Sequence, residues 1–219
     1  MKINIKERLA SLKEVAALAE FLREPDQLDS IFKLAQNMKQ SDLASYMHDV
    51  LMADESMREM IAERWQPTHY SLQELQKLPE GTLGNAYASQ LLALNLSPDD
   101  LLPKGEIKTD LDYIQLRLRQ THDIIHVITG FKTNAAGEIG LQAFNLAQIK
   151  SPVSALIIFG GILSGLKRKS NSSLDDLLIA LSKGFRMGEE AVTLQTQKLE
   201  EEWGTNLEEL RKRYRVDPA

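Results

Sequence analysis

Cysteine is absent from the 219 residues, so the chain can form no disulfide, no thiolate metal site and no cysteine nucleophile. Any metal must therefore use nitrogen and oxygen ligands. Positive charge is also outnumbered: the chain has 26 Lys and Arg residues and 31 Asp and Glu residues, which give a net charge of −5. The basic residues are spread along the chain, and the electrostatic footprint of a nucleic-acid-binding protein is missing. We therefore expect neither DNA nor RNA as a partner.

The sequence has no long hydrophobic run either. Its longest uncharged stretch, residues 151–166, contains one proline and three glycines and is shorter than the roughly 20 residues that a membrane-spanning helix needs. The N-terminal segment mixes Lys with Glu and lacks both the apolar run of a signal peptide and the Arg and Ser richness of a transit peptide. We therefore expect a cytoplasmic or peripheral membrane protein without a signal peptide or a transmembrane helix.

Helix signals recur along the chain, whereas strand signals are scarce. Ser71 and Thr205 are each followed three residues later by glutamate, which is the pattern of a capping box. Pro152 follows a serine. This pair is typical of a helix start, because serine can cap the helix and proline is favoured at the first helical position. The sequence predicts an all-α fold, a single-domain multi-helix bundle over residues 1–219. The expected helices span residues 5–22, 26–38, 41–53, 55–64, 71–77, 84–95, 110–129, 135–149, 152–166, 173–186, 188–203 and 206–213.

One segment combines residue types that bind metal ions. His122 and His126 lie one turn apart in the helix expected over 110–129, so their rings project from one face and can bind a single ion. Asp123 lies beside them at the same level. A short link lets the next helix fold back, which brings Glu138, near its first turn, toward the same point. We therefore predict a metal site formed by His122, Asp123, His126 and Glu138.

These ligand types leave the identity of the metal open. Two neutral imidazoles and two carboxylates balance a divalent charge and suit zinc, ferrous iron or manganese, of which we place zinc first. The alternative is structural: two core histidines hydrogen-bonded to carbonyl groups, Asp123 in a salt bridge, and Glu138 at a helix N-terminus where the dipole favours it. Spacing by itself does not decide between these two interpretations.

Residues 122–138, HDIIHVITGFKTNAAGE, resemble in ligand types and spacing the HDxxH-(eleven residues)-E signature of a coenzyme Q (ubiquinone) biosynthesis family, the fourth-numbered component of that pathway. The segment LPEGTLG at residues 78–84 is similar to that family too, and the likeness covers roughly residues 20–215. Other positions similar to the family are Tyr87, Ala88, Tyr113, Arg117, Arg119, Gly188, Ala191, Trp203, Leu207 and Arg211.

The resemblance implies a helical fold, a divalent metal at the four predicted positions, and a role on prenylated ring intermediates of quinone synthesis. One form of this role is oxidative C1 decarboxylation of a prenylated hydroxybenzoate-type ring, in which the ion polarises a ring oxygen or activates water or dioxygen. Arg119, one turn before His122, is then a candidate contact for the substrate anion, and a surface salt bridge is its alternative. Gln142 and Asn145 depart from the Lys and Glu of the mitochondrial branch, which leaves the quinone precursor open.

The other form of this role is a non-catalytic scaffold that binds a prenyl lipid and organises the quinone-biosynthesis enzymes. The apolar helices over residues 139–166 would hold the prenyl tail, with Leu141, Ile157, Ile158 and Gly161 as candidate contacts. An ordinary filled core is the alternative. The expected partners are a prenyl lipid or quinone intermediate, other quinone-biosynthesis proteins, a membrane surface and a second copy of this chain.

A third interpretation, outside this family, is an HD-type metal phosphohydrolase, because His48 and Asp49 form a second His-Asp pair. Such a site needs ligands that are far apart in the sequence, whereas His126 and Glu138 supply nearer ones. A partly buried structural histidine is the simpler account of His48.

Overall fold

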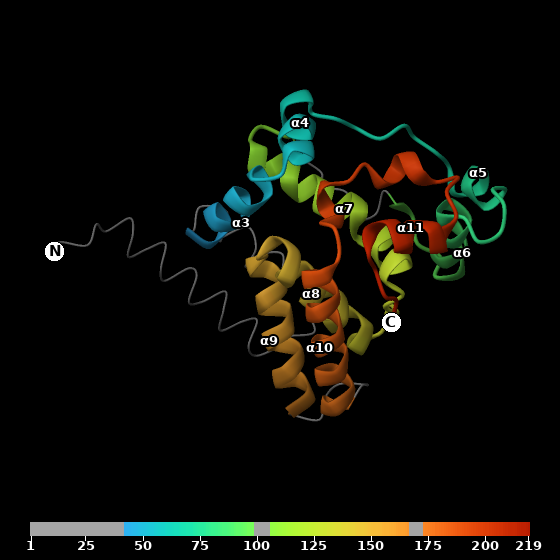
Figure 1. Ribbon diagram of the computed structural model, residues 1–219. Helices are drawn as coiled ribbons and strands as arrows, with labels where there is room; N and C mark the ends of the chain where they lie inside the picture. The colour runs from blue at the N-terminus through green and yellow to red at the C-terminus, as the bar shows by residue number, and fades with distance from the viewer. Residues whose placement is uncertain (1–41, 99–105, 167–172) are drawn as a thin grey trace. The chain divides into compact units, whose positions relative to one another are not determined.

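The computed structural model describes three stretches of the chain, and its regular structure there is helical (Figure 1). The described stretches are residues 42–98, 106–166 and 173–219. The helices are α3 (Asp42–Met52), α4 (Glu55–Glu63), α5 (Leu72–Gln76), α6 (Leu83–Ala93), α7 (Asp110–Thr129), α8 (Ala135–Ile149), α9 (Pro152–Leu166), α10 (Leu174–Glu190), the 3-10 helices η3 (Leu194–Thr196) and η4 (Leu199–Glu202), and α11 (Leu207–Tyr214).

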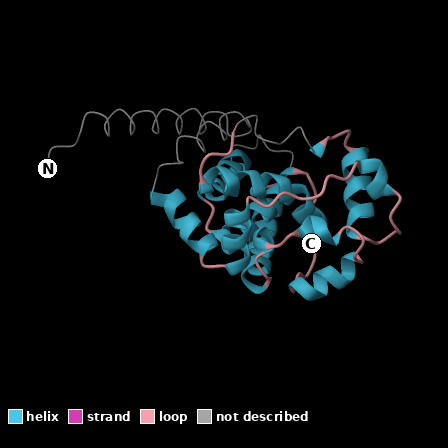
Figure 2. Ribbon diagram, turned by 90° about the horizontal axis from the view of Figure 1, so that it is seen from above, coloured by secondary structure: helices cyan, strands magenta, loops and turns pink. Residues whose placement is uncertain are grey.

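The all-α prediction is confirmed (Figure 2). Within the described residues the nearest approach to a strand is one isolated antiparallel bridge between Thr82 and Asn206. The capping box at Ser71 is present, because its hydroxyl accepts from the N–H of Glu74 and the Glu74 carboxylate accepts from the N–H of Ser71. The helices expected over 5–22 and 26–38 lie outside the described residues.

The helix expected over residues 188–203 is wrong. α10 continues to Glu190, and only the two short 3-10 helices follow before α11. The chain leaves the helix because the N–H of Val192 donates to the carbonyl of Tyr214 at 2.9 Å rather than to a preceding turn. Thr196 is then held by a hydrogen bond from its hydroxyl to the Asp54 carboxylate at 3.0 Å. Contacts distant in sequence therefore outweigh local helix propensity here.

The capping box expected at Thr205 is also wrong. Asn206 is the N-cap of α11, and its side-chain oxygen accepts from the N–H groups of Glu208 and Glu209. The hydroxyl of Thr205 instead donates to the Glu202 carboxylate at 2.6 Å. Two adjacent capping residues compete for one helix start, and asparagine is the stronger cap.

The chain divides into two compact units. One contains Asn134–Phe185, and so α8, α9 and most of α10, together with the described part of the segment that ends at Met47. The other contains Arg186–Ala219 and His48–Thr133, apart from residues 99–105. That residues 1–219 form one domain stays a prediction.

Local signals fix both ends of α7. Thr109 and Asp112 form a capping box, in which each side chain accepts from the other residue's backbone N–H, at 3.2 and 3.0 Å. The helix ends at Gly130, whose φ of 76° is the left-handed conformation that favours glycine. Between these ends, Ile114 and Ile124 are at most 1% exposed. α7 is therefore a fixed element on which functional side chains can be placed.

Small residues let α8, α9 and α10 pack closely (Figure 1). A Cβ atom added at Gly184 of α10 would overlap the backbone carbonyl of Gly140 in α8, so the two backbones touch there. A Cβ added at Gly161 of α9 would meet the side chain of Ile139. None of the described helices is both long enough and apolar enough to cross a membrane.

Candidate metal centre

α7 presents His122 and His126 side by side, as the one-turn spacing predicts. Their ring centroids are 4.8 Å apart, and the rings meet edge to face at 89°. His126 is 1% exposed, whereas His122 keeps partial access to solvent. The pair therefore offers one buried and one accessible imidazole on the same helix face.

A backbone hydrogen bond determines which nitrogen of His126 carries the proton. Nδ1 of His126 lies 2.9 Å from the carbonyl oxygen of Phe131. Because a carbonyl oxygen can only accept, Nδ1 is the protonated nitrogen and Nε2 carries the lone pair. Histidines that bind metals commonly donate their second N–H in this way, which fixes the ring orientation. A buried histidine with a purely structural role would make the same bond. By itself the bond therefore agrees with both interpretations of the pair, metal ligands or structural core histidines.

Glu138 lies in the first turn of α8. Asn134 starts this helix by accepting from the N–H of Gly137 at 2.9 Å, and the N–H of Glu138 donates to the carbonyl of Asn134 at 2.9 Å. Only residues 130–134 connect the end of α7 to this turn. The short connection and the cap explain why a carboxylate twelve positions beyond His126 can approach the histidines.

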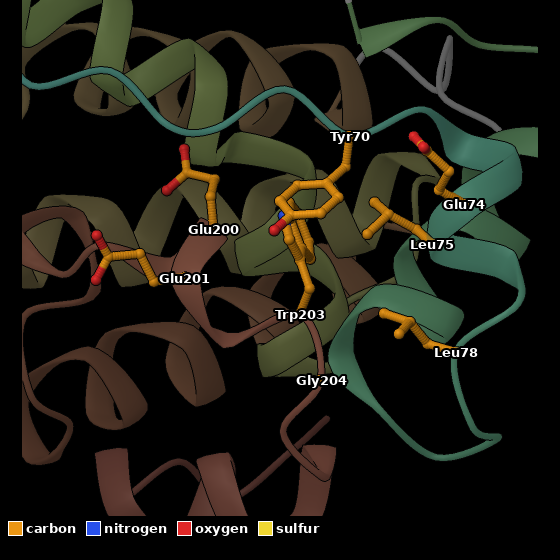
Figure 3. Close-up of a pocket in the computed structure, with 8 residues that line it drawn as sticks. All are labelled: Tyr70, Glu74, Leu75, Leu78, Glu200, Glu201, Trp203 and Gly204. Atoms are coloured by element: carbon orange, nitrogen blue, oxygen red, sulfur yellow. The ribbon is translucent and has the colours of Figure 1, made fainter.

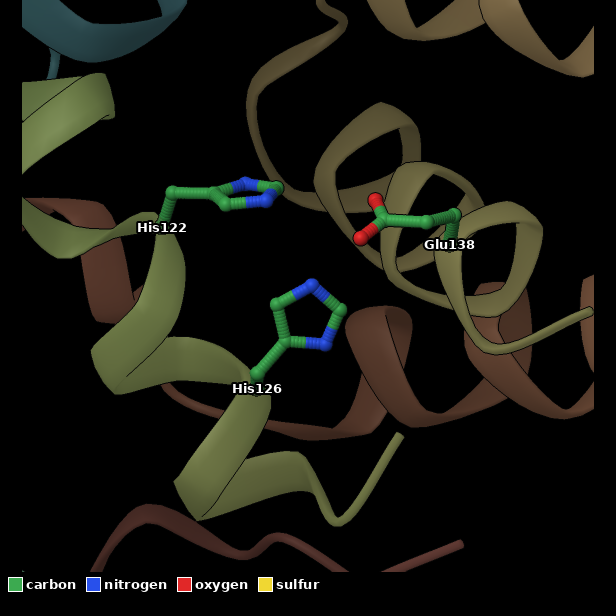
Figure 4. Close-up of side chains that lie close together, drawn as sticks. All are labelled: His122, His126 and Glu138. Carbon is green, nitrogen blue, oxygen red and sulfur yellow. The ribbon is translucent and has the colours of Figure 1, made fainter. Parts of the chain in front are cut away.

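His122, His126 and Glu138 point toward one another (Figure 4). One ligand atom of each lies within 4.8 Å of the others. Ligands that share one ion at about 2.1 Å are at most about 4.2 Å apart, so a small side-chain adjustment would bring all three to a common ion. Two imidazoles and one carboxylate are also the ligand set of many catalytic zinc sites, which leave a further position for water or substrate. The three side chains therefore fit a divalent ion, whose identity they do not determine.

Asp123 is not part of this group of three. It is partly buried and directly follows His122 in the helix. Consecutive residues of a helix do not face the same direction. Its role as a fourth ligand stays a prediction, as does the four-residue site as a whole.

Arg119, the predicted anion contact, is partly buried on α7. Burial lowers the pKa of its guanidinium, which nevertheless stays charged at neutral pH. A partly desolvated cation on the histidine-bearing helix is consistent with an anion contact. Its assignment to substrate stays a prediction.

The four predicted lipid contacts differ in exposure. Leu141 is fully buried and Ile158 is 8% exposed. Ile157 and Gly161 are partly exposed, and the space beside Gly161 is taken by Ile139. Their role in binding a prenyl chain stays a prediction.

The His48–Asp49 pair is a local contact. Nδ1 of His48 lies 3.4 Å from the carboxylate of Asp49, the next residue, and Asp49 is exposed. Within the described residues, neither belongs to a group of three or more potential ligands.

The sequence did not predict a buried ion pair between Arg117 and Glu200. Arg117 of α7 donates to the two carboxylate oxygens of Glu200 at 2.6 and 2.9 Å, and the side chains are 0% and 6% exposed. The Arg117 guanidinium also lies 4.9 Å from the ring centroid of Trp65. The partners are 83 positions apart, so no local pattern could have paired them.

Glu200 also lines a cavity of about 320 Å³ (Figure 3). None of the residues around it belongs to the predicted metal or lipid sites. In this view the Tyr70 ring overlaps the indole of Trp203, with Glu200 and Glu201 on one side of the two rings and Glu74 on the other. The lining residues are Tyr70, Glu74, Leu75, Leu78, Glu200, Glu201, Trp203 and Gly204.

Comparison with known proteins points to one family. Residues 1–219 match the family described as coenzyme Q (ubiquinone) biosynthesis protein Coq4. The mitochondrial ubiquinone biosynthesis protein COQ4 homolog of Aedes aegypti is 30% identical over 152 residues, which are 67% of this chain and 53% of that protein. The mitochondrial homolog from Rattus norvegicus is 32% identical over 149 residues, 67% of this chain and 55% of that protein. The chain thus spans about half the length of the curated relatives it matches.

A solved structure agrees with the observed fold. It is the crystal structure of a protein assigned to ubiquinone biosynthesis from Nostoc punctiforme PCC 73102, which is 33% identical to this chain. The TM-score is 0.83, and the match covers 93% of this chain and 97% of that chain.

Proposed function

Because this chain belongs to the coenzyme Q (ubiquinone) biosynthesis family Coq4, we propose that it is a metal-binding protein that acts on a prenylated ring intermediate of quinone synthesis. The observation that carries the proposal is the convergence of His122, His126 and Glu138, whose ligand atoms lie within 4.8 Å of one another. Asp123, at the position of the family signature, completes the proposed ligand set.

The chain's own residues would bind and orient a substrate anion. His126 is held with Nε2 as its lone-pair nitrogen, because Nδ1 donates to Phe131. His122 is partly exposed to solvent, so the substrate would reach the metal site from the side of His122. Arg119 would hold the ring carboxylate. When bound, a divalent ion supplies Lewis acidity at a ring oxygen.

The reaction class that we propose is oxidative decarboxylation at C1. The ring carboxyl group leaves as CO2 and a hydroxyl group takes its place, which consumes dioxygen and two electrons with two protons and releases water. Dioxygen and an external two-electron donor are therefore required co-substrates.

The second candidate function is a scaffold that binds a prenyl lipid without catalysis. Large apolar side chains are exposed on α9 and α10, which favours contact with lipid, a membrane surface or another protein. Other quinone-biosynthesis enzymes and a second copy of this chain are the protein partners that we propose. The exposed apolar residues are Phe159, Leu166, Leu178, Ile179 and Phe185.

Elemental analysis of the purified protein tests the metal site. We expect stoichiometric divalent metal in the wild type and its loss in His122→Ala and Glu138→Ala, with circular dichroism reporting that the helices are retained. The Asp123→Asn variant tests the fourth ligand, and His48→Ala is the control that should keep its metal. Metal lost on His48→Ala would instead favour the phosphohydrolase interpretation.

Lipid extraction from the same samples separates the two functions. A prenylated ring acid that is converted under dioxygen with a reductant supports the enzyme. A bound prenyl lipid without turnover supports the scaffold. Folded wild-type protein without metal would refute the metal site.

A further inference from the structure

His126 lies in the last turn of α7, residues 126–129, and every backbone carbonyl of this turn accepts a hydrogen bond. A helix leaves its last four carbonyl groups without partners inside the helix. Here the carbonyl of His126 accepts from the N–H of Gly130 at 2.9 Å. The carbonyls of Val127 and Ile128 accept from the Arg211 guanidinium, at 3.1 and 2.9 Å. The carbonyl of Thr129 accepts from the N–H of Ala219 at 2.8 Å.

Arg211 and Ala219 therefore form an end cap on α7, which we call the α7 end cap. Both come from a segment more than 80 positions away from the helix that they cap. The positive guanidinium lies where the helix dipole is negative, which adds an electrostatic contribution to the two hydrogen bonds. The cap thus fixes the last turn of α7 against a different part of the chain.

The capping residues are themselves well anchored. Arg211 lies on α11, where Leu210 is 0% and Tyr214 is 7% exposed. Its Nη1 is paired with the carboxylate of Glu208 at 2.5 Å, and its side chain is 16% exposed. Because Glu208 takes Nη1, Nε and Nη2 of Arg211 are free to donate to the α7 carbonyls.

The capped turn also determines the geometry of His126. Its backbone carbonyl is inside the turn, and its side chain donates to Phe131, the residue directly after Gly130. A Cβ added at Gly130 would lie 3.2 Å from the backbone N of Ala219 and 3.2 Å from Cβ of Pro218, so the turn and the capping segment are closely packed. A displacement of the cap would therefore move the carbonyl that orients the imidazole.

We propose that Arg211 is a positioning residue for the metal centre, acting through the α7 end cap on the ring orientation of His126. This inference rests on the proposed metal site. Partners that orient a metal ligand typically change metal affinity by about 10- to 100-fold when they are removed. The bonds of Arg211 go to Glu208 and to the carbonyls of Val127 and Ile128, so its effect is transmitted by the backbone of α7.

The test measures binding of Co²⁺ alone to the full chain, by competition with a chelator and by the visible absorption of the bound ion. We expect Arg211→Ala to raise the Co²⁺ dissociation constant by about 10- to 100-fold and to change the absorption bands. Arg211→Lys should recover part of the affinity, because an ammonium group keeps the charge but lacks the planar fork that reaches two carbonyls.

Arg213→Ala is the matched control. Arg213 lies on the same helix and pairs with Glu202 and Glu209, both outside α7. We expect this variant to bind Co²⁺ with the wild-type dissociation constant and spectrum. An equal change in Arg213→Ala and Arg211→Ala would mean a general effect on α11 and would overturn the proposal.

The outcomes separate this inference from the proposed function. Wild-type protein that binds no Co²⁺ overturns both. Wild-type binding with an unchanged constant and spectrum in Arg211→Ala overturns the positioning role alone. Should Arg211→Ala fail to fold, Arg211→Lys decides: an increased constant with altered bands supports the proposal, and wild-type values overturn it.

Discussion

The two compact units of the chain hold their helices together in different ways. In the unit that contains α7, buried and partly buried polar groups make directed bonds over long sequence distances: Arg117 to Glu200, and Arg211 to the end of α7. In the unit of α8, α9 and α10, backbones approach at glycines, as at Gly140 and Gly184. A buried hydrogen bond from Ser154 to Gln142 joins α9 to α8 as well, so the two units differ in which kind of contact is prominent and not in having only one kind.

This difference is informative about the roles of the two units. Directed bonds fix the orientation of side chains and of the backbone, which a metal site requires. Close packing through small residues places no such demand on orientation. The same unit also has exposed large apolar side chains on α9 and α10. Substitutions that remove one kind of interaction should therefore affect one unit and not the other.

The largest effect should follow from breaking the buried ion pair. In Glu200→Gln, the Arg117 charge stays buried without its counter-charge, and we expect the free energy of unfolding to fall by about 3 kcal/mol. Urea-induced unfolding measures this loss. The matched control is Glu201→Gln, because Glu201 is exposed and its replacement should change stability by less than about 0.5 kcal/mol. Equal effects of the two variants would contradict the importance of the pair.

A smaller loss should follow from filling the glycine contact. In Gly184→Ala the new methyl group overlaps the carbonyl of Gly140, and we expect a loss of about 1–3 kcal/mol from overpacking. Gly165→Ala is the matched control, because there the nearest atom to a Cβ would be the flexible end of the Leu177 side chain at 3.0 Å, and the Leu174 atoms at 3.5 and 3.6 Å are at ordinary van der Waals distance. That variant should be neutral or gain stability from alanine's higher helix propensity. Thermal unfolding followed by circular dichroism compares the two.

The smallest effect concerns a single directed bond in the α7 unit. Tyr113 donates its hydroxyl to the carbonyl of Trp65 at 2.7 Å, so Tyr113→Phe should cost about 1 kcal/mol near neutral pH. Burial raises the pKa of Tyr113 above its usual value of 10.0. The contribution of the neutral Tyr113 hydroxyl to the free energy of unfolding is therefore fully present below pH 10, and it is lost as the pH rises through the folded-state pKa.

Urea titrations at neutral pH and above pH 10 test this pH dependence. The stability difference between wild type and Tyr113→Phe should shrink at the higher pH. A difference of the same size at both pH values would contradict the role of burial. Tyr214, whose pKa is also raised, is common to both proteins and cancels from the comparison.

The sequence predicted elements whose signals are local. α7, α8 and α9 begin and end at the predicted residues, because caps, glycine and proline act within one turn. The predicted helix over 188–203 failed because Val192 bonds to Tyr214, a partner that no local pattern reveals. Local periodicity likewise does not reveal the Arg117–Glu200 pair.

The candidate site shows the same division. The His122 and His126 pair follows from helix periodicity, and Glu138 follows from a short link and a cap. The sequence predicted Asp123 as a fourth ligand, which stays a prediction, because a residue next to a ligand in a helix faces another direction. Whether Asp123 can coordinate the ion depends on its side-chain conformation, which sequence spacing does not determine.

The distribution of tryptophan has a practical consequence for measuring stability. The chain has two tryptophans, and Trp65 and Trp203 both lie in the unit that contains α7. Intrinsic tryptophan emission therefore reports directly on the melting of that unit, whereas circular dichroism averages over the helices of both. Coincident transitions by the two probes would indicate that the units unfold cooperatively, and a helical signal that outlasts or precedes the emission change would reveal independent unfolding.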